Sequence, residues 1–186
     1  MSEHHVCPWW MGYLLASPIR KLRDNPRKLL GPYIEEGMTA VDAGCAMGFF
    51  SMPMARMVGE NGKVICVDLQ ERMLRVLKKR AFRAGLAGRV EARRCTAASL
   101  MLSDLPGRAD FALAYAVLHE APDRERFIGE IYRALKKGGV LFFGEPAGPV
   151  SRDFFQEEAA MIEAAGFIPM EARHQRYGMD AVFIKP

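Results

Sequence analysis

The chain has 186 residues, enough for one full hydrophobic core but not for a separate substrate domain. Half of the residues are hydrophobic and 26% are charged, a balance typical of a soluble globular protein that excludes a disordered or fibrous chain. The formal net charge of +4 is modest and scattered, so solvated helix faces explain it more simply than a nucleic-acid surface does.

The sequence carries no sign of membrane insertion or export. No apolar stretch approaches the ~20 residues of a membrane span, and the N-terminus lacks the basic and apolar regions of a signal peptide. We therefore expect a cytoplasmic protein. Cys7, Cys45, Cys66 and Cys95 lie far apart without a Cys-x-x-Cys pair, so neither a zinc site nor a disulfide framework is expected.

Short apolar runs alternate with longer amphipathic segments, which predicts parallel strands connected by helices. The first three strands are expected at residues 40–43, 64–67 and 90–95, with helices at 49–58 and 71–84 between them. Two further strands, at 111–115 and 140–143, enclose a helix at 124–135. Lys136 and Lys137 are expected at the C-terminus of this last helix, where cations are favourable.

The last part of the chain predicts a helix at 152–165 and strands at 167–173 and 179–184. The link between these two strands is so short that they must be antiparallel. The whole order predicts an α/β protein with a Rossmann-like, doubly wound sheet of five parallel strands, closed by an antiparallel edge hairpin.

We expect a single domain over residues 1–186, with a cofactor-binding core at 38–186 and an N-terminal segment at 1–37. A helix in that segment starts at Asn25 as its cap, with Pro26 in the first turn. The residues before it could form a lid, a soft metal or metalloid site, or a hydrophobic strap. The strap is favoured and no metal is expected, because His-x-x-Cys spacing alone is poor evidence for a site. The residues concerned are His4, His5, Cys7, Trp9, Trp10 and Tyr13.

A ligand of an open parallel sheet binds outside the carboxyl ends of the strands, normally beside the first strand. Glycines in the loop there permit positive φ and close approach of a ligand, and the following helix offers unpaired N–H groups to an anion. Asp68, twenty residues after Gly48, ends the second strand, where a carboxylate can accept hydrogen bonds from both ribose hydroxyls. Together these features predict an adenosine site. The loop residues are Asp42, Gly44, Cys45, Ala46, Gly48 and Phe49.

The spacing Asp-x-Gly-x-x-x-Gly lacks the third glycine of a dinucleotide fingerprint and resembles the class I S-adenosylmethionine-dependent methyltransferases. The resemblance runs from residue 32 to 186 and includes the stretches 109–120 and 135–139 and the edge hairpin. The pattern is similar to that of the ubiquinone and menaquinone biosynthesis methyltransferases and their small-molecule relatives. It implies the strand order 3-2-1-4-5-7-6, S-adenosylmethionine as cofactor and methyl transfer to a small-molecule acceptor.

Two positions depart from that family pattern. The family usually has glycine where Ala46 stands, and near Cys95 it usually presents an acid to the adenine amino group, where this chain offers only Thr96 and backbone groups. Adenine recognition is therefore the contact that the sequence defines least. By position, Leu69 and Ala97 are expected to flank the adenine ring, and Tyr115 or Ala116 to lie near the methionine part.

Candidate groups on the acceptor side are His119, Glu120 and Glu145, expected at the ends of the fourth and fifth strands. His119 could act as a general base because its usual pKa lies near neutrality, and either acid could orient it or bind a cationic acceptor. Helix capping or pairing with an arginine stays open for both acids. Residues 115–118 lack the Asn/Asp-Pro-Pro-aromatic run of base N-methyltransferases, which favours a small molecule.

Two other functions stay open. A nicotinamide-dependent oxidoreductase is disfavoured by the missing third glycine and by the lack of a Ser/Tyr-x-x-x-Lys pair. A non-catalytic protein that binds S-adenosylmethionine and acts through a partner would have the same loop. The methyl acceptor and the oligomeric state are not determined by the sequence.

Overall fold

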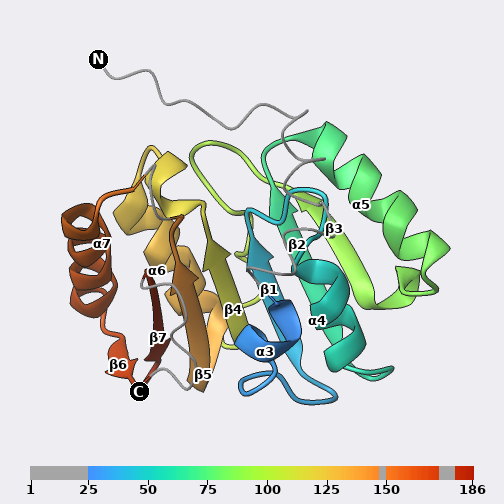
Figure 1. Ribbon diagram of the computed structural model, residues 1–186, viewed down its shortest axis with the longest axis horizontal. Helices are drawn as coiled ribbons and strands as arrows, with labels where there is room; N and C mark the ends of the chain where they lie inside the picture. Colours follow the sequence, from blue (N-terminus) through green and yellow to red (C-terminus); the bar gives the residue numbers. More distant parts are fainter. Residues whose placement is uncertain (1–24, 147–149, 172–178) are drawn as a thin grey trace.

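The structure is a computed structural model that describes residues 25–146, 150–171 and 179–186. Its centre is a seven-stranded sheet in the order β3-β2-β1-β4-β5-β7-β6 (Figure 1). The strands are β1 Thr39–Ala43, β2 Lys63–Asp68, β3 Val90–Arg94, β4 Ala109–Tyr115, β5 Leu135–Gly144, β6 Ile168–Met170 and β7 Asp180–Ile184. The helices are α3 Pro26–Leu30, α4 Ser51–Met57, α5 Glu71–Arg83, α6 Arg124–Ala134 and α7 Arg152–Ala164, with 3₁₀ turns η1 Ala87–Arg89 and η2 Leu118–Glu120.

Strand β1 lies at the point where the strand order reverses. It pairs in parallel with β2 on one side and with β4 on the other. Strands β3 and β5 continue the two parallel halves, and β7 runs antiparallel to both β5 and β6. The predicted doubly wound sheet, its strand order and its antiparallel edge hairpin are therefore confirmed.

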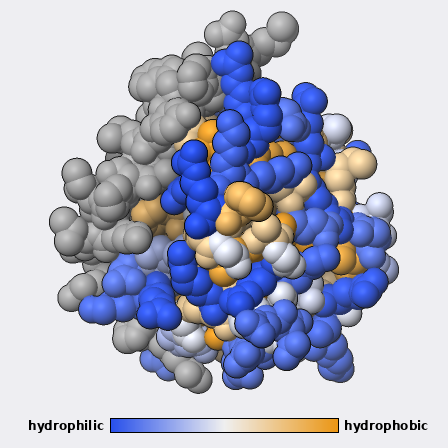
Figure 2. Space-filling model, turned by 90° about the vertical axis from the view of Figure 1, so that its right-hand side faces the viewer, coloured by the Kyte–Doolittle hydropathy of each residue, from blue (hydrophilic) through white to orange (hydrophobic). Residues whose placement is uncertain are grey.

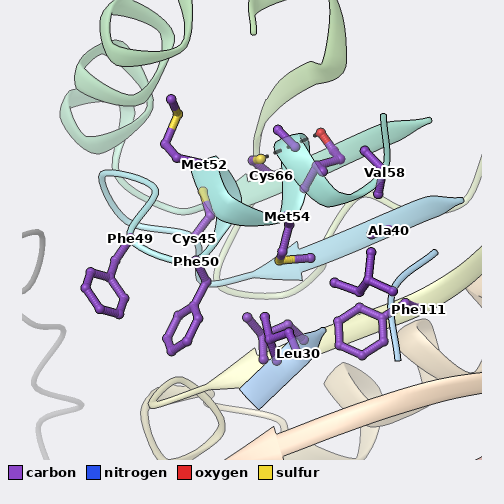
Figure 3. Close-up of a cluster of buried hydrophobic side chains, with 14 of the residues drawn as sticks. Leu30, Ala40, Cys45, Phe49, Phe50, Met52, Met54, Val58, Cys66 and Phe111 are labelled. Atoms are coloured by element: carbon purple, nitrogen blue, oxygen red, sulfur yellow. Dashed lines mark hydrogen bonds between the residues drawn. The ribbon is translucent and has the colours of Figure 1, made fainter. Parts of the chain in front are cut away.

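Two hydrophobic cores cover the two faces of the sheet, because alternate residues of each strand point to opposite faces. Helices α3, α4 and α5 pack on one face, around buried side chains that include Leu30, Met54 and Phe111 (Figure 3). Helices α6 and α7 pack on the other face with Ile131 and Ile162. Cys66, on β2, has no exposed surface.

The described part of the N-terminal segment joins the first core. The Asn25 side chain accepts hydrogen bonds from the amides of Arg27 and Lys28, at 3.1 and 3.4 Å, so the predicted cap of α3 is confirmed. Leu30, at the end of this helix, is fully buried in that core. The residues predicted to form a lid, a metal site or a strap lie at positions 4–13, outside the described residues.

The prediction that Lys136 and Lys137 lie at the C-terminus of α6 is wrong. Strand β5 begins at Leu135, immediately after the helix, so both lysines are extended, and the Lys136 ammonium pairs with Asp110 at 2.6 Å. A cation that binds carbonyls at this helix end is Lys185, whose Nζ donates to Tyr132 and Leu135 at 2.8 and 2.7 Å. Strand β7 runs antiparallel to β5, so Lys185, which directly follows β7, lies beside the end of α6.

The outer face of α5 is a solvated basic surface, as expected from the scattered charge. Figure 2 shows this side of the molecule to be hydrophilic over most of its area. Its exposed cations are Arg72, Arg75, Lys78, Lys79 and Arg83. Within the described ranges, no helix is both long and apolar enough to cross a membrane.

We predict that Lys185→Ala lowers the free energy of unfolding by about 1–3 kcal/mol, because two helix-terminal carbonyls lose a charged donor. Lys137→Ala is the matched control, since this lysine is exposed and a surface change of this kind usually stays within about 0.5 kcal/mol. Urea unfolding of both variants measures the difference. A larger loss in Lys137→Ala would show that the helix end depends on the predicted lysine after all.

Candidate functional site

The loop between β1 and α4 is tied to the neighbouring strand by backbone hydrogen bonds. The amides of Gly44 and Cys45 both donate to the carbonyl of Val67, at 2.9 and 3.0 Å. The Ala46 amide donates to Asp68 Oδ2 at 2.8 Å. Since these amides already have acceptors within the protein, they position the loop and are not spare donors for an anion. Helix α4 also begins at Ser51, two residues later than predicted.

The two glycines of this loop are required by the packing of the protein itself. Gly44 and Gly48 have φ of +78° and +82°, a region that favours glycine. A Cβ on Gly44 would lie 2.5 Å from Val117, and one on Gly48 would lie 2.3 Å from Leu77. Ala46, where the resembled family has glycine, also has a positive φ, of 47°. The loop thus keeps its shape at the expense of strain at an alanine.

The loop forms one wall of a pocket at the carboxyl ends of β1, β2 and β4. Every residue predicted from the sequence to bind the cofactor lines this pocket, except Gly48. Gly48 instead lies against the Leu77 side chain. Those in the lining are Asp42, Gly44, Cys45, Ala46, Phe49, Asp68, Leu69, Thr96, Ala97 and Tyr115. The structure adds residues that the sequence did not indicate, among them Phe50, Gln70, Met73, Phe127 and Glu130.

The two acids at the strand ends have different tasks. Asp42 is 3% exposed and accepts a hydrogen bond of 2.5 Å from the Ser51 hydroxyl, which fixes the start of α4. Asp68 accepts one backbone N–H on each oxygen, from Ala46 and from Gln70, both at 2.8 Å. Burial raises the pKa of Asp68, and these two donors oppose the rise. Each oxygen keeps a further lone pair, so the carboxylate can accept two more donors from the pocket.

The turn after β3 contains no acid of its own, and Glu130 of α6 brings a carboxylate to it. The Glu130 side chain accepts the Leu100 amide at 2.9 Å and the Ser99 hydroxyl at 3.1 Å, both on its Oε2. It therefore orders the turn that carries Thr96 and Ala97 and places an acid in the pocket lining. Sequence reasoning missed Glu130 because it looked for an acid beside Cys95, and only the packing of α6 brings this side chain to the turn.

Two cysteines line the pocket, and both are held as neutral thiols. Burial raises the pKa of Cys45 well above its usual value, with the neighbouring Cys66 thiol adding to the rise. Burial also raises the pKa of Cys95 to about 11, and the charge of Asp68 acts in the same direction. Because the thiolate is the reactive form, these two side chains contribute shape and not a nucleophile.

Two of the three predicted acceptor-side residues, His119 and Glu145, form a hydrogen-bonded pair next to the pocket. His119 Nδ1 lies 2.6 Å from Glu145 Oε2, and the His119 amide donates to Glu145 Oε1 at 3.3 Å. A carboxylate only accepts, so Nδ1 carries the proton and Nε2 is free to take one. The pKa of His119 is raised, chiefly by the hydrogen bond with Glu145 and against the effect of burial. Glu120 lines the pocket, with Oε1 3.9 Å from Nε2; His119 and Glu145 are outside that lining.

Comparison with known sequences identifies a family for most of the chain. A family model described as a methyltransferase domain matches residues 34–173. A curated relative, the ubiquinone/menaquinone biosynthesis C-methyltransferase UbiE of Escherichia fergusonii, is 27% identical over 158 residues. That alignment covers 82% of this chain and 62% of the relative. The chain thus spans about three fifths of the length of the curated relatives it matches.

Solved structures share the fold. A SAM dependent methyltransferase from Aquifex aeolicus superposes with a TM-score of 0.85 at 23% identity, covering 97% of this chain and 100% of that one. Phosphoethanolamine N-methyltransferase 2 of Haemonchus contortus, in complex with S-adenosyl-L-methionine, has a TM-score of 0.64 at 21% identity over 78% of this chain and 37% of that one. Because the family match covers most of the sequence, the chain belongs to the methyltransferase domain family, and its fold is that of class I methyltransferases of known structure.

Proposed function

We propose that this chain transfers a methyl group from S-adenosylmethionine to a small-molecule acceptor that binds beside Glu120 and the His119–Glu145 pair. The observation that carries the proposal is that one pocket connects the β1 loop, the Asp68 carboxylate and Glu120. This supports a cofactor side and an acceptor side that are neighbours, with Glu120 in the shared lining. Methyl transfer needs that alignment, because it is an in-line displacement.

The pocket fits the parts of the cofactor. Asp68 has one acceptor position left on each oxygen, which suits the two ribose hydroxyls. Leu69 and Ala97 offer apolar contact to the adenine ring, beside the turn that Glu130 orders. Gly44 and Tyr115 line the part of the pocket assigned to the methionine group. When bound, S-adenosylmethionine supplies an already activated methyl group, so the protein needs no nucleophile of its own.

The acceptor side offers a base and a carboxylate. His119 takes a proton from the acceptor at Nε2, Glu145 holds the ring through Nδ1, and Glu120 faces the acceptor from the pocket lining. Residues 115–118 lack the run that holds an extruded base, which supports a small molecule. The curated relatives are named as C-methyltransferases of ubiquinone and menaquinone biosynthesis, so quinone-type acceptors belong in the first panel, with phenols, amines and thiols.

Calorimetric titration with S-adenosylmethionine, S-adenosylhomocysteine and NADH tests the cofactor. We predict micromolar binding of the two adenosyl ligands and no binding of NADH, since the loop lacks the third glycine of a dinucleotide site. Binding of NADH alone would exclude the proposal. Binding of the adenosyl ligands without turnover of any acceptor in the panel would favour a non-catalytic binding protein.

Asp68→Ala is predicted to weaken S-adenosylhomocysteine binding about 10- to 150-fold, the equivalent of roughly 1.5–3 kcal/mol for charge-assisted hydrogen bonds. Asp110→Ala is the control, because this acid pairs with Thr39 and Lys136 outside the pocket and its loss leaves the dissociation constant unchanged. The same titration measures both variants. An Asp68→Ala protein that binds like the wild type would show that the ribose lies elsewhere.

His119→Asn is predicted to lower kcat about 100-fold or more at neutral pH, because it removes the general base, while cofactor binding stays unchanged. In the wild type, kcat should rise with pH as His119 loses its proton, with a midpoint above the usual histidine pKa. Glu145→Gln should move that rise to lower pH, because the imidazolium loses its carboxylate partner. A pH profile of kcat measures both effects. An unchanged profile in the two variants would remove His119 from the reaction.

A further inference from the structure

One face of helix α6 lines the pocket at the carboxyl ends of the strands. Asp123, which caps the helix, Phe127 and Glu130 are spaced i, i+4 and i+7, so they lie on one side of it, and all three belong to the pocket lining. The Glu130 side chain is only 10% exposed. A carboxylate that is nearly buried needs hydrogen-bond donors to offset its desolvation cost. The donors around Glu130 therefore indicate what this wall of the pocket can bind.

The two well-formed hydrogen bonds of Glu130 reach the same carboxyl oxygen. The Leu100 amide and the Ser99 hydroxyl both donate to Oε2, at 2.9 and 3.1 Å. The Ser99 oxygen in turn accepts the Met101 amide at 3.0 Å, while its own proton points to the carboxylate. Two donors on one oxygen fix the orientation of the carboxyl group. They leave Oε1 as the oxygen with spare capacity.

Among the described residues, Oε1 of Glu130 has one weak partner. The Nε of Arg126, one helical turn earlier, lies 3.4 Å from it, and the side chain of that arginine is 54% exposed. An ion pair with an exposed arginine at this distance contributes little, and it uses one of the two lone pairs of the oxygen. Oε1 therefore keeps an acceptor position for a donor that a ligand brings into the pocket.

The turn that Glu130 binds is the part of the pocket expected to hold adenine. Ala97, predicted to flank the ring, precedes Leu100 by three residues and lines the same pocket. Backbone hydrogen bonds between Thr96 and Ser99, of 3.0 and 3.4 Å, close this turn into one unit. The exocyclic amino group of adenine is a donor, and an ionised carboxylate only accepts. The two groups are thus chemically complementary on this side of the pocket.

We propose that Glu130 makes the pocket selective for adenine, by accepting a hydrogen bond from the exocyclic amino group on Oε1. The inference rests on the proposed function only in taking S-adenosylmethionine as the ligand. Hypoxanthine has an oxygen in place of that amino group, so two acceptors would face each other with no proton between them. The selective acid comes from α6, whereas the resembled family usually has its acid near the end of β3.

Calorimetric titration of the full chain with S-adenosylhomocysteine and S-inosylhomocysteine tests the inference. We expect the inosyl ligand to bind at least about 10-fold more weakly, because a hydrogen bond to a charged group is lost. Equal binding of the two ligands by the wild type would overturn the proposal and leave the proposed function intact. A wild type that binds neither ligand would contradict the proposed function itself.

Glu130→Gln assigns the selectivity to this side chain. The amide oxygen should take the place of Oε2, where two donors converge, so that the NH₂ group replaces Oε1 and presents a donor to the base. We expect the preference for the adenosyl ligand to fall at least about 10-fold. Glu125→Gln is the matched control, because this acid of α6 is exposed and outside the pocket lining, so its preference stays at the wild-type value. A wild-type preference in Glu130→Gln would refute the assignment.

Ser99→Ala separates recognition of the base from order in the turn. This change removes one donor of Oε2 but keeps the carboxylate, so both affinities should change alike and the preference should stay as in the wild type. Circular dichroism and thermal unfolding check that each variant folds. A folded Glu130→Gln protein that loses both ligands in the same proportion would limit Glu130 to ordering the turn. A preference that falls equally in Ser99→Ala would contradict the proposal in the same way.

Discussion

The hydrogen bond from the Ala46 amide to the Asp68 carboxylate joins the ends of β1 and β2, and the pocket depends on it. It holds the β1 loop against the neighbouring strand, and the Val67 carbonyl reinforces the contact by accepting two further amides of the loop. The same bond orients Asp68 and leaves one acceptor position on each oxygen facing the pocket. One contact therefore shapes the loop and orients the carboxylate that we propose to bind the ribose.

The pocket concentrates backbone strain as well as polar groups. Ala46 and Ala116 both line it, and both have positive φ, of 47° and 57°. Each is held by a hydrogen bond to a neighbouring strand end, since the Ala46 amide donates to Asp68 and the Ala116 amide to the Gly144 carbonyl. Strained residues persist where the surrounding structure determines their conformation, and they cluster at functional sites. The parallel sheet provides that surrounding structure here.

Charge is distributed unequally around the site. On the side proposed for the cofactor, Asp68 accepts two backbone amides and Glu130 accepts one amide and one hydroxyl, so both carboxylates order loops. The side proposed for the acceptor has His119 and Glu145 in a close pair, with 2.6 Å between Nδ1 and Oε2. Satisfied groups make a rigid binding surface, whereas a histidine paired with a carboxylate can exchange a proton near neutral pH. The two sides thus suit the binding and the proton transfer that we propose.

The periodicity of apolar residues and the turn glycines predicted the strands and the helices, because these patterns are local in the sequence, whereas the strand order followed from the family resemblance. Glycine spacing and the acid at the end of β2 likewise pointed to residues that line a single pocket. Tertiary structure alone decided which lysine binds the end of α6 and which acid orders the turn after β3. Lys185 and Glu130 are each delivered by an element distant in the chain. Spacing along a chain does not encode such contacts, since they arise only when helices and the antiparallel edge pack on the sheet.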